Sequence, residues 1–131
     1  MTWLLDTSVC IPLINRTDAR AAERLLSLSP GAVRLCSVVK AELQFGAHNS
    51  GRVAENLQRV EIFCRAFESL PFDDAAAGRY GVVRAQLRRE GRPIGASDLM
   101  IASIALSGGL TLATRNTEEF ARVPGLDVER W

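Results

Sequence analysis

The chain has 131 residues, 47% of them hydrophobic and 24% charged, which is the balance of an ordinary folded domain with its own core. We therefore expect a single domain that spans residues 1–131. The formal net charge of +1 excludes a chain that overall charge alone would attach to nucleic acid or to a membrane surface.

The start of the chain and its cysteines indicate a compartment. The first residues, MTWLLDTS, carry no basic segment and only a short apolar run, so we expect neither a signal peptide nor a membrane anchor. Cys10, Cys36 and Cys64 form no CxxC pair, which argues against a zinc site, and because Cys10 and Cys36 fall within apolar runs we expect buried free thiols there. These features predict a cytoplasmic protein without membrane contact.

Short β-like runs alternate with helical patterns along the whole chain. This alternation predicts an α/β fold, a three-layer α/β/α sandwich with a mostly parallel central sheet. The expected strands are Thr2–Asp6, Ala32–Cys36, Ser69–Phe72, Leu110–Thr114 and Leu126–Glu129. The expected helices are Asp18–Ser29, Ser37–Ala47, Arg52–Glu68, Asp73–Glu90 and Ser97–Ser107. Among their ends, Ser37 and Asp73 are expected N-caps, and Gly91 and Gly108 are expected C-terminal glycines.

An aspartate ends the first apolar run, WLLD, and Thr7 and Ser8 follow it directly. A carboxylate at the end of a buried strand costs free energy unless something pairs with it. Asp6 fits two interpretations at this point, a helix cap or a metal ligand. Its position favours neither by itself, but in a parallel sheet the functional crevice lies outside the carboxyl ends of the strands.

The segment SVVKAELQFGAH contains the second candidate acid. At about 100° per residue, Lys40, Gln44 and His48 form one polar stripe of a helix, so His48 is expected at the surface. Glu42 falls on the opposite side, in the middle of an apolar face. A buried Glu–Arg pair and a bound cation explain such a carboxylate equally well.

The stretch GRPIGASDLMIASIALSGG contains the third candidate acid. The residues after Asp98 are apolar nearly all round, which predicts a buried helix. An acid in the first turn also complements the helix dipole, with Ser97 as the cap. Asp98 taken alone therefore does not require a metal.

The segment LTLATRNTEEF contributes further polar groups at the end of the fourth expected strand. Thr114 ends that strand, and Asn116 and Glu119 follow it in a short helix. Either Asn116 or Glu119 reaches a site shared with the other acids, or the segment is a capped surface turn.

Several arginines are candidates for contacting backbone phosphates. Arg115 lies beside the segment just described. A second group fits a solvated helix end at least as well, because arginines late in a helix suit its dipole. Its members are Arg84, Arg88, Arg89 and Arg92.

Taken together, Asp6, Glu42 and Asp98, with Asn116 or Glu119, are oxygen donors from four separate segments. Clustered carboxylates raise one another's pKa values unless a cation lies among them. Because no cysteine or histidine belongs to the group, Mg²⁺ or Mn²⁺ fits better than Zn²⁺. A cation of this kind activates a water for attack on a phosphoryl group.

The sequence resembles a known family, the PIN-domain ribonucleases, and within it the VapC-type toxins of bacterial toxin–antitoxin pairs. Asp6, Glu42 and Asp98 match the three most dependable acids of the family. Glu119 matches the acid found in this toxin branch, and Asn116 stands where many members carry aspartate. The similar stretches are LLDTSV, SVVKAELQFGA, GRPIGASDLMIASIALSGGLTLATRNTEEF and VPGLDVERW.

The resemblance implies an Mg²⁺-dependent endoribonuclease, with Mn²⁺ as a substitute, that acts on tRNA or other structured RNA and leaves 5′-phosphate and 3′-hydroxyl ends. It also implies a homodimer and a cognate antitoxin that neutralises it. Asp6 and Asp98 would hold the metal with Glu42, while Glu42 and Glu119 would orient a second cation or the attacking water. Thr114, Arg115 and Asn116 would support the site and its substrate.

One apolar segment, Val9–Ile14, has no obvious place in the core. We expect it to form a groove for the tail of the antitoxin, and an arginine of that tail would fill the acidic site with bidentate bonds.

Two other classes of protein compete with a nuclease. A phosphatase with an aspartyl nucleophile usually has a second acid two residues after the first, but that position is Ser8. A receiver domain would need a lysine after a late strand, and Lys40 lies far from one. A catalytically silent module that binds metal or nucleic acid is the third class, which only an assay separates from an enzyme.

Overall fold

A five-stranded sheet forms the centre of the computed structural model, which describes residues 1–131. All four strand pairings are parallel, and the strand order is β3-β2-β1-β4-β5. The mostly parallel sheet expected from the sequence is therefore confirmed. The strands are β1 (Trp3–Leu5), β2 (Val33–Cys36), β3 (Glu68–Leu70), β4 (Thr111–Thr114) and β5 (Val128–Arg130).

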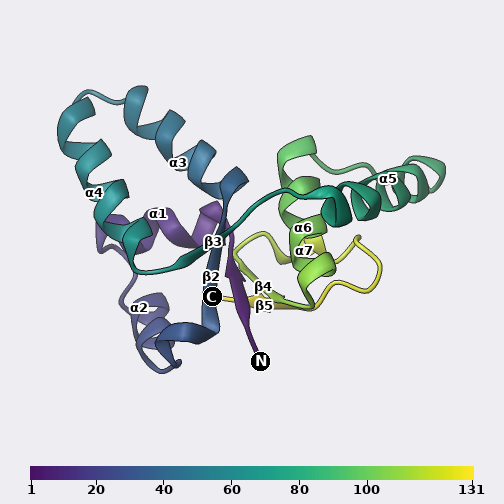
Figure 1. Cartoon of the computed structure of the whole chain (residues 1–131), viewed down its shortest axis with the longest axis horizontal. Coiled ribbons are helices and arrows are strands. Elements are labelled where there is room, and N and C mark those ends of the chain that lie inside the picture. The colour runs from purple at the N-terminus through teal and green to yellow at the C-terminus, as the bar shows by residue number, and fades with distance from the viewer.

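Helices cover both faces of this sheet, which confirms the three-layer arrangement. Figure 1 shows α1 to α4 on one side of the sheet and α5 to α7 on the other. None of them combines the length and apolar character that a membrane span requires. The helices are α1 (Thr7–Asn15), α2 (Ala19–Leu26), α3 (Ser37–His48), α4 (Val53–Arg65), α5 (Asp74–Arg89), α6 (Ala96–Gly108) and α7 (Thr117–Phe120), with a 3₁₀ turn at Pro30–Ala32.

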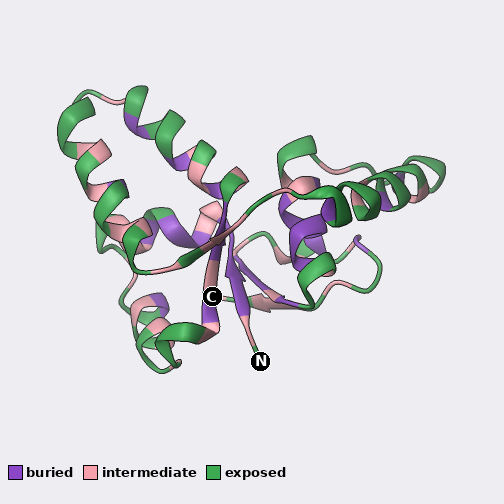
Figure 2. Cartoon of the chain, viewed as in Figure 1, coloured by how far each residue is buried: buried purple, intermediate pink, exposed green.

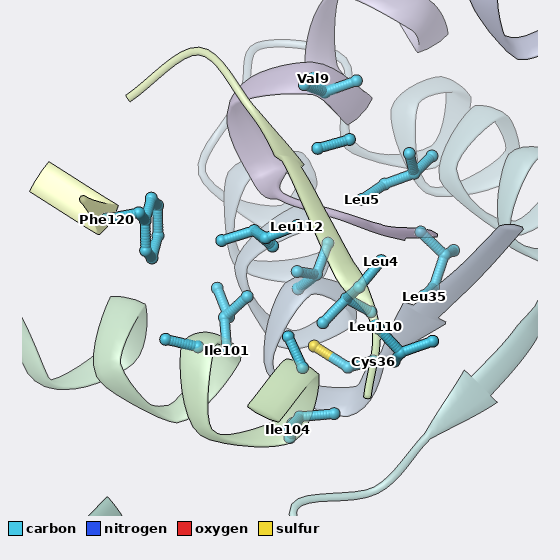
Figure 3. Packing of buried hydrophobic residues seen from close by; sticks show 14 of the residues in the cluster. Leu4, Leu5, Val9, Leu35, Cys36, Ile101, Ile104, Leu110, Leu112 and Phe120 are labelled. Atoms are coloured by element: carbon cyan, nitrogen blue, oxygen red, sulfur yellow. The ribbon is translucent and has the colours of Figure 1, made fainter. Parts of the chain in front are cut away.

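The core fills both faces of the central strands, because helices exclude water from each side. Every residue of β1 is buried, as is typical of strands in a parallel sheet that is covered on both faces. Figure 2 shows this burial continuing along the inner sides of the helices. In Figure 3, Phe120 of α7, Ile101 of α6 and Leu112 of β4 turn toward one another on one face of the sheet.

Helix α1 is the main departure from the sequence-based expectation. The segment Val9–Ile14, expected outside the core, belongs to this helix, and Val9 and Cys10 are fully buried. Pro12 lies inside α1, where proline disfavours a helix, and the apolar residues show no single stripe. Ile11 still faces outward, so part of the segment remains at the surface.

The helix ends agree only in part with the expected caps. Asp73 caps α5 as predicted, since its carboxylate accepts the backbone N–H of Ala76 at 2.9 Å. Ser37 is the first residue of α3 rather than its N-cap, and the cap is Cys36. At α6, Gly95 takes the N-cap position expected for Ser97; Gly108 is the last helical residue, as predicted, and Gly109 follows it as the C-cap with a positive φ of 65°.

Replacing Leu4 with alanine in the middle of β1 should lower the free energy of unfolding by about 2–5 kcal/mol, because it removes a fully buried side chain and leaves a cavity. Chemical denaturation followed by circular dichroism measures this loss. Leu26→Ala is the matched control: Leu26 is 83% exposed, so its loss should stay within about 0.5 kcal/mol. Equal losses for the two variants would contradict the described core.

Candidate active site

The candidate site lies where the order of the strands reverses. The chain runs from β1 outward to β2 and β3, and then returns to place β4 on the other side of β1. Parallel sheets have a crevice at such a point, outside the carboxyl ends of the two diverging strands. Asp6 directly follows β1, and Thr114 is the last residue of β4. Both residues therefore border this crevice.

Asp6 is a buried carboxylate held by three hydrogen bonds. The residue is only 2% exposed, and its Oδ1 accepts the backbone N–H of Thr7 at 2.8 Å. Oδ2 accepts the hydroxyls of Ser8 at 2.8 Å and Thr114 at 2.7 Å. No arginine or lysine forms an ion pair with it. Asp6 thus caps α1 and is a buried carboxyl group without a basic partner.

The same hydroxyls hold the loop that follows β4. The backbone N–H of Arg115 donates to Ser8 Oγ at 3.0 Å, and that of Asn116 donates to Thr114 Oγ1 at 3.0 Å. Ser8 and Thr7 are positioning residues that the motif argument missed, although their signal is present directly behind the aspartate in WLLDTS. The bonds fix the β4–α7 loop relative to β1.

Glu42 reaches the site from α3. It is half-buried, and Oε1 accepts the hydroxyl of Thr7 at 2.7 Å. It belongs to no ion pair, so the buried Glu–Arg alternative is wrong. The buried stripe of α3 is Val39, Leu43 and Ala47, which places Glu42 at its edge rather than in the middle of an apolar face. His48 is exposed, as predicted.

Asp98 and Glu119 meet beside Gly95, which precedes α6. Glu119 Oε1 accepts the backbone N–H of Gly95 at 3.4 Å. A Cβ atom at Gly95 would lie 3.8 Å from Asp98 Oδ2, so Asp98 borders the same backbone position. Phe120 is fully buried and fixes the neighbouring Glu119 near the sheet. The two acids come from the first turn of α6 and from α7.

The electrostatics join the four acids into one site. Burial raises the pKa of Asp98, and the charges of Glu119, Asp6 and Glu42 raise it further, to about 7. A hydrogen bond with Glu119 is part of the same shift. The pKa of Asp98 therefore depends on the other three predicted acids. A cation bound among them would favour the ionised form of Asp98.

The donor set is compatible with a hydrated hard cation. No three His, Cys, Asp or Glu side chains are arranged to hold a metal ion directly by themselves. The candidate donors are all oxygen atoms, which Mg²⁺ accepts together with several waters, whereas Zn²⁺ takes nitrogen and sulfur ligands more readily. The buried, unpaired carboxylate of Asp6 supplies the strongest single requirement for such an ion.

The predicted supporting residues differ in their surroundings and contacts. Asn116 is exposed as the residue before α7 and makes no side-chain cap bond. The guanidinium of Arg115 pairs with Asp18, at the N-cap of α2. Arg84 lies over the ring of Tyr80, and with Arg88 it lines a separate hollow between α5 and the start of α6. Arg89 and Arg92 are exposed.

An apolar hollow of about 250 Å³ adjoins Glu42. Helices α1, α3 and α4 form its walls, and Glu42 lines the hollow while accepting the hydroxyl of Thr7. The outward part of Val9–Ile14 therefore does border a groove, as expected, although the segment is also part of the core. The lining residues are Ile11, Ile14, Asn15, Glu42, Leu43, Gly46, Ala47, Asn56, Arg59 and Val60.

Comparison with known proteins agrees with this geometry. Residues 3–126 match the PIN domain family. The chain is 42% identical to the "tRNA(fMet)-specific endonuclease VapC" of Shigella flexneri, over 100% of this chain and 98% of that one. Together these matches show that the chain belongs to the PIN-domain family, in its VapC ribonuclease branch.

Solved structures resemble the whole chain. VapBC2 from Rickettsia felis, bound to a DNA fragment from its promoter, has a TM-score of 0.95 and 34% identity and covers 100% of this chain and 99% of that one. VapBC-5 from Mycobacterium tuberculosis, described as a member of the VapBC family of toxin–antitoxin systems, has a TM-score of 0.75 and 30% identity, with 98% and 96% coverage. The fold is thus shared over nearly its full length.

The acids should make the metal-free protein sensitive to pH. The folded pKa of Asp98 lies above its unfolded value, so the folded state holds this proton more tightly. The contribution to stability is therefore present at low pH and is lost as the pH rises from about 4 to about 7. In EDTA, Asp98→Asn should be more stable than the parent, by a margin that grows over this range. Denaturant unfolding at several pH values measures the margin, and a constant margin would contradict the shift.

Proposed function

We propose that residues 1–131 form one nuclease domain, a divalent-cation-dependent endoribonuclease toxin that a cognate antitoxin neutralises. The observation that carries this proposal is the convergence of Asp6, Glu42, Asp98 and Glu119 at the point where the strand order reverses, without a basic partner. Membership of the VapC branch supports the RNA substrate. The protein acts in the cytoplasm, where that substrate is found.

Each acid has a role that follows from its surroundings. Asp6, preset by its three hydrogen bonds, would hold the cation together with Asp98, and Glu42 would orient a second cation or the attacking water. Glu119, beside Asp98, orients the attacking water. When bound, Mg²⁺, or Mn²⁺ in its place, activates that water and neutralises charge on the leaving oxygen. Thr7 keeps Glu42 in place through its hydroxyl, and Thr114 does the same for Asp6.

The substrate class is tRNA. The Shigella flexneri relative is named as specific for tRNA(fMet) and is 42% identical to this chain over its whole length. We therefore propose initiator tRNA as the first RNA to test, with cleavage that leaves 5′-phosphate and 3′-hydroxyl ends. End-mapping of cellular RNA after brief expression identifies both the RNA and the bond.

The partner is an antitoxin whose tail occupies the hollow between α1, α3 and α4. Structural relatives are VapBC pairs, one of them described as a toxin–antitoxin system. Half of the residues that line the hollow are hydrophobic, and its polar groups include Asn15, Asn56, Arg59 and one carboxylate, Glu42, next to the acids. An amphipathic tail would bury apolar side chains there and pair an arginine with the carboxylates. The family resemblance also supports a homodimer, which analytical ultracentrifugation tests.

Asp98→Asn and Glu119→Gln should each reduce RNA cleavage by more than about 100-fold, the upper range for a group that only orients a metal ligand. Growth inhibition in cells should disappear with them. Glu118→Gln is the matched control, since Glu118 is an exposed neighbour on the same short helix and is not among the groups that shift Asp98. Full cleavage by folded Asp98→Asn protein would refute the proposed site.

Cleavage should require a hard divalent cation. EDTA should abolish it, Mg²⁺ or Mn²⁺ should restore it, and Ca²⁺ should bind while supporting little turnover, because calcium tolerates looser geometry than the reaction needs. Gel assays with a labelled tRNA measure this series. Undiminished cleavage by EDTA-treated protein would rule out the proposed chemistry and leave a metal-independent nuclease.

Gly46→Arg should abolish binding of the antitoxin to the purified protein, because the new side chain would occupy the hollow and pair with Glu42 one turn earlier on α3. Gly46 lines the hollow, and a Cβ atom there meets nothing within 4 Å, so the substitution fits the fold and also improves helix propensity. The new side chain would fill the groove and repel an arginine-bearing tail. Gly78→Arg on α5, equally free of contacts, is the control. Normal binding of the antitoxin to purified Gly46→Arg protein would show that the tail binds elsewhere.

A further inference from the structure

A basic surface adjoins the acids on the side of β5. Two hollows lie there and share Arg115 and Arg130 in their linings. One, of about 300 Å³, also contains Asn116 and Glu119 of the candidate site. The other, of about 540 Å³, contains Arg20 and Arg24. Arg130 therefore stands between the acidic site and an arginine-rich hollow.

Two of the four arginines in the larger hollow are already neutralised. Arg24 makes a bidentate pair with Glu129, with both N–O distances 3.0 Å, and lies over the rings of Trp3 and Trp131. Arg115 pairs with Asp18. Asp18 and Glu129 are the only carboxylate side chains in the lining. Arg20 and Arg130 consequently have no carboxylate partner and leave the hollow with excess positive charge.

Neighbouring groups hold Arg130 in a defined position. It ends β5 and pairs in register with Thr114, so it lies at the same edge of the sheet as the acids. Its Nη1 donates to the backbone carbonyl of Arg115 at 2.7 Å. A guanidinium carries five N–H donors, and this bond uses one of them. The remaining donors are available to a ligand, and the residue is exposed.

Electrostatics make such a surface necessary for an RNA substrate. In the proposed function four carboxylates would lie beside the phosphodiester that is cut, and the chain as a whole has a formal net charge of only +1. Overall attraction therefore supplies little affinity for a polyanion. Arginine is the side chain best suited to bind phosphate oxygens with two parallel hydrogen bonds.

We infer that Arg130 and Arg20 bind neighbouring phosphates of the RNA strand where it leaves the acidic site. The inference rests on the proposed nuclease function and adds the path of the substrate to it. Arg130 contacts the phosphate nearer to the acids, and Arg20, in the first turn of α2, contacts the one beyond it. Arg115 and Arg24 shape the hollow through their ion pairs.

The test measures RNA binding without cleavage, in the Asp98→Asn background, as a function of salt concentration. In this background, Arg20→Gln and Arg130→Gln should each weaken the binding of labelled tRNA by about tenfold, which is the effect expected from the loss of one charge-assisted hydrogen bond. Each should also reduce the slope of log K against log salt by about 0.7 to 1. In the active enzyme, each should raise KM and leave kcat nearly unchanged. Arg130→Lys should recover part of the affinity.

Arg79→Gln is the matched control, because Arg79 is an exposed arginine on α5 that lines none of these hollows. Unchanged affinity and salt slope in both arginine variants would overturn the inference. So would an effect confined to Arg130→Gln, since it would trace to the lost bond to the Arg115 carbonyl. Loss of antitoxin binding with intact RNA binding would assign the surface to the protein partner instead. Failure of the parent enzyme to cut any RNA would reject the nuclease proposal itself, which is a separate result.

Discussion

Three hydrogen bonds to the carboxylate of Asp6 join the elements that make the site. They come from the start of α1, through Thr7 and Ser8, and from the end of β4, through Thr114. Because β1 and β4 diverge at this point, the bonds set the geometry of the crevice between them. Thr7 extends the connection to Glu42 on α3, and Ser8 extends it to the backbone of Arg115. The positions of the other polar groups depend on this buried charge.

The same arrangement places function in conflict with stability. A buried carboxylate without a basic partner destabilises the folded state, and the raised pKa of Asp98 shows that the acids oppose one another. Substitution of an arginine would relieve this repulsion, and ion pairs elsewhere in the chain show that arginine is available for it. The cluster is instead left open to a cation, to substrate or to an inserted arginine of an antitoxin. The compact core of β1, β4 and α6 offsets the stability that is lost at this open acidic site.

The sequence predicted most of the fold because strand–helix alternation and caps such as Asp73 act locally. It did not predict α1, because Pro12 disfavours a helix and the apolar residues of this segment form no single stripe with helical spacing. The acids were found individually and grouped as oxygen donors from four segments, and the resemblance supported that grouping. Their actual relations could not be read from the chain: Glu42 lies at the edge of its helix face, and Arg115 turns to Asp18. Those outcomes depend on tertiary contacts between distant segments, as does the role of Arg130, which no local pattern marks.

The proposed activity depends most on a cation site formed by the acids at the reversal of the strand order. Crystals soaked in Mn²⁺ and measured for anomalous scattering test it directly, because the signal locates the ion without reference to activity. We expect a peak between Asp6 and Asp98, bound by at least one carboxylate oxygen at about 2 Å, with water completing the coordination. The peak should vanish in Asp98→Asn crystals. A strong manganese peak elsewhere, with none among these acids at saturating Mn²⁺, would contradict the account.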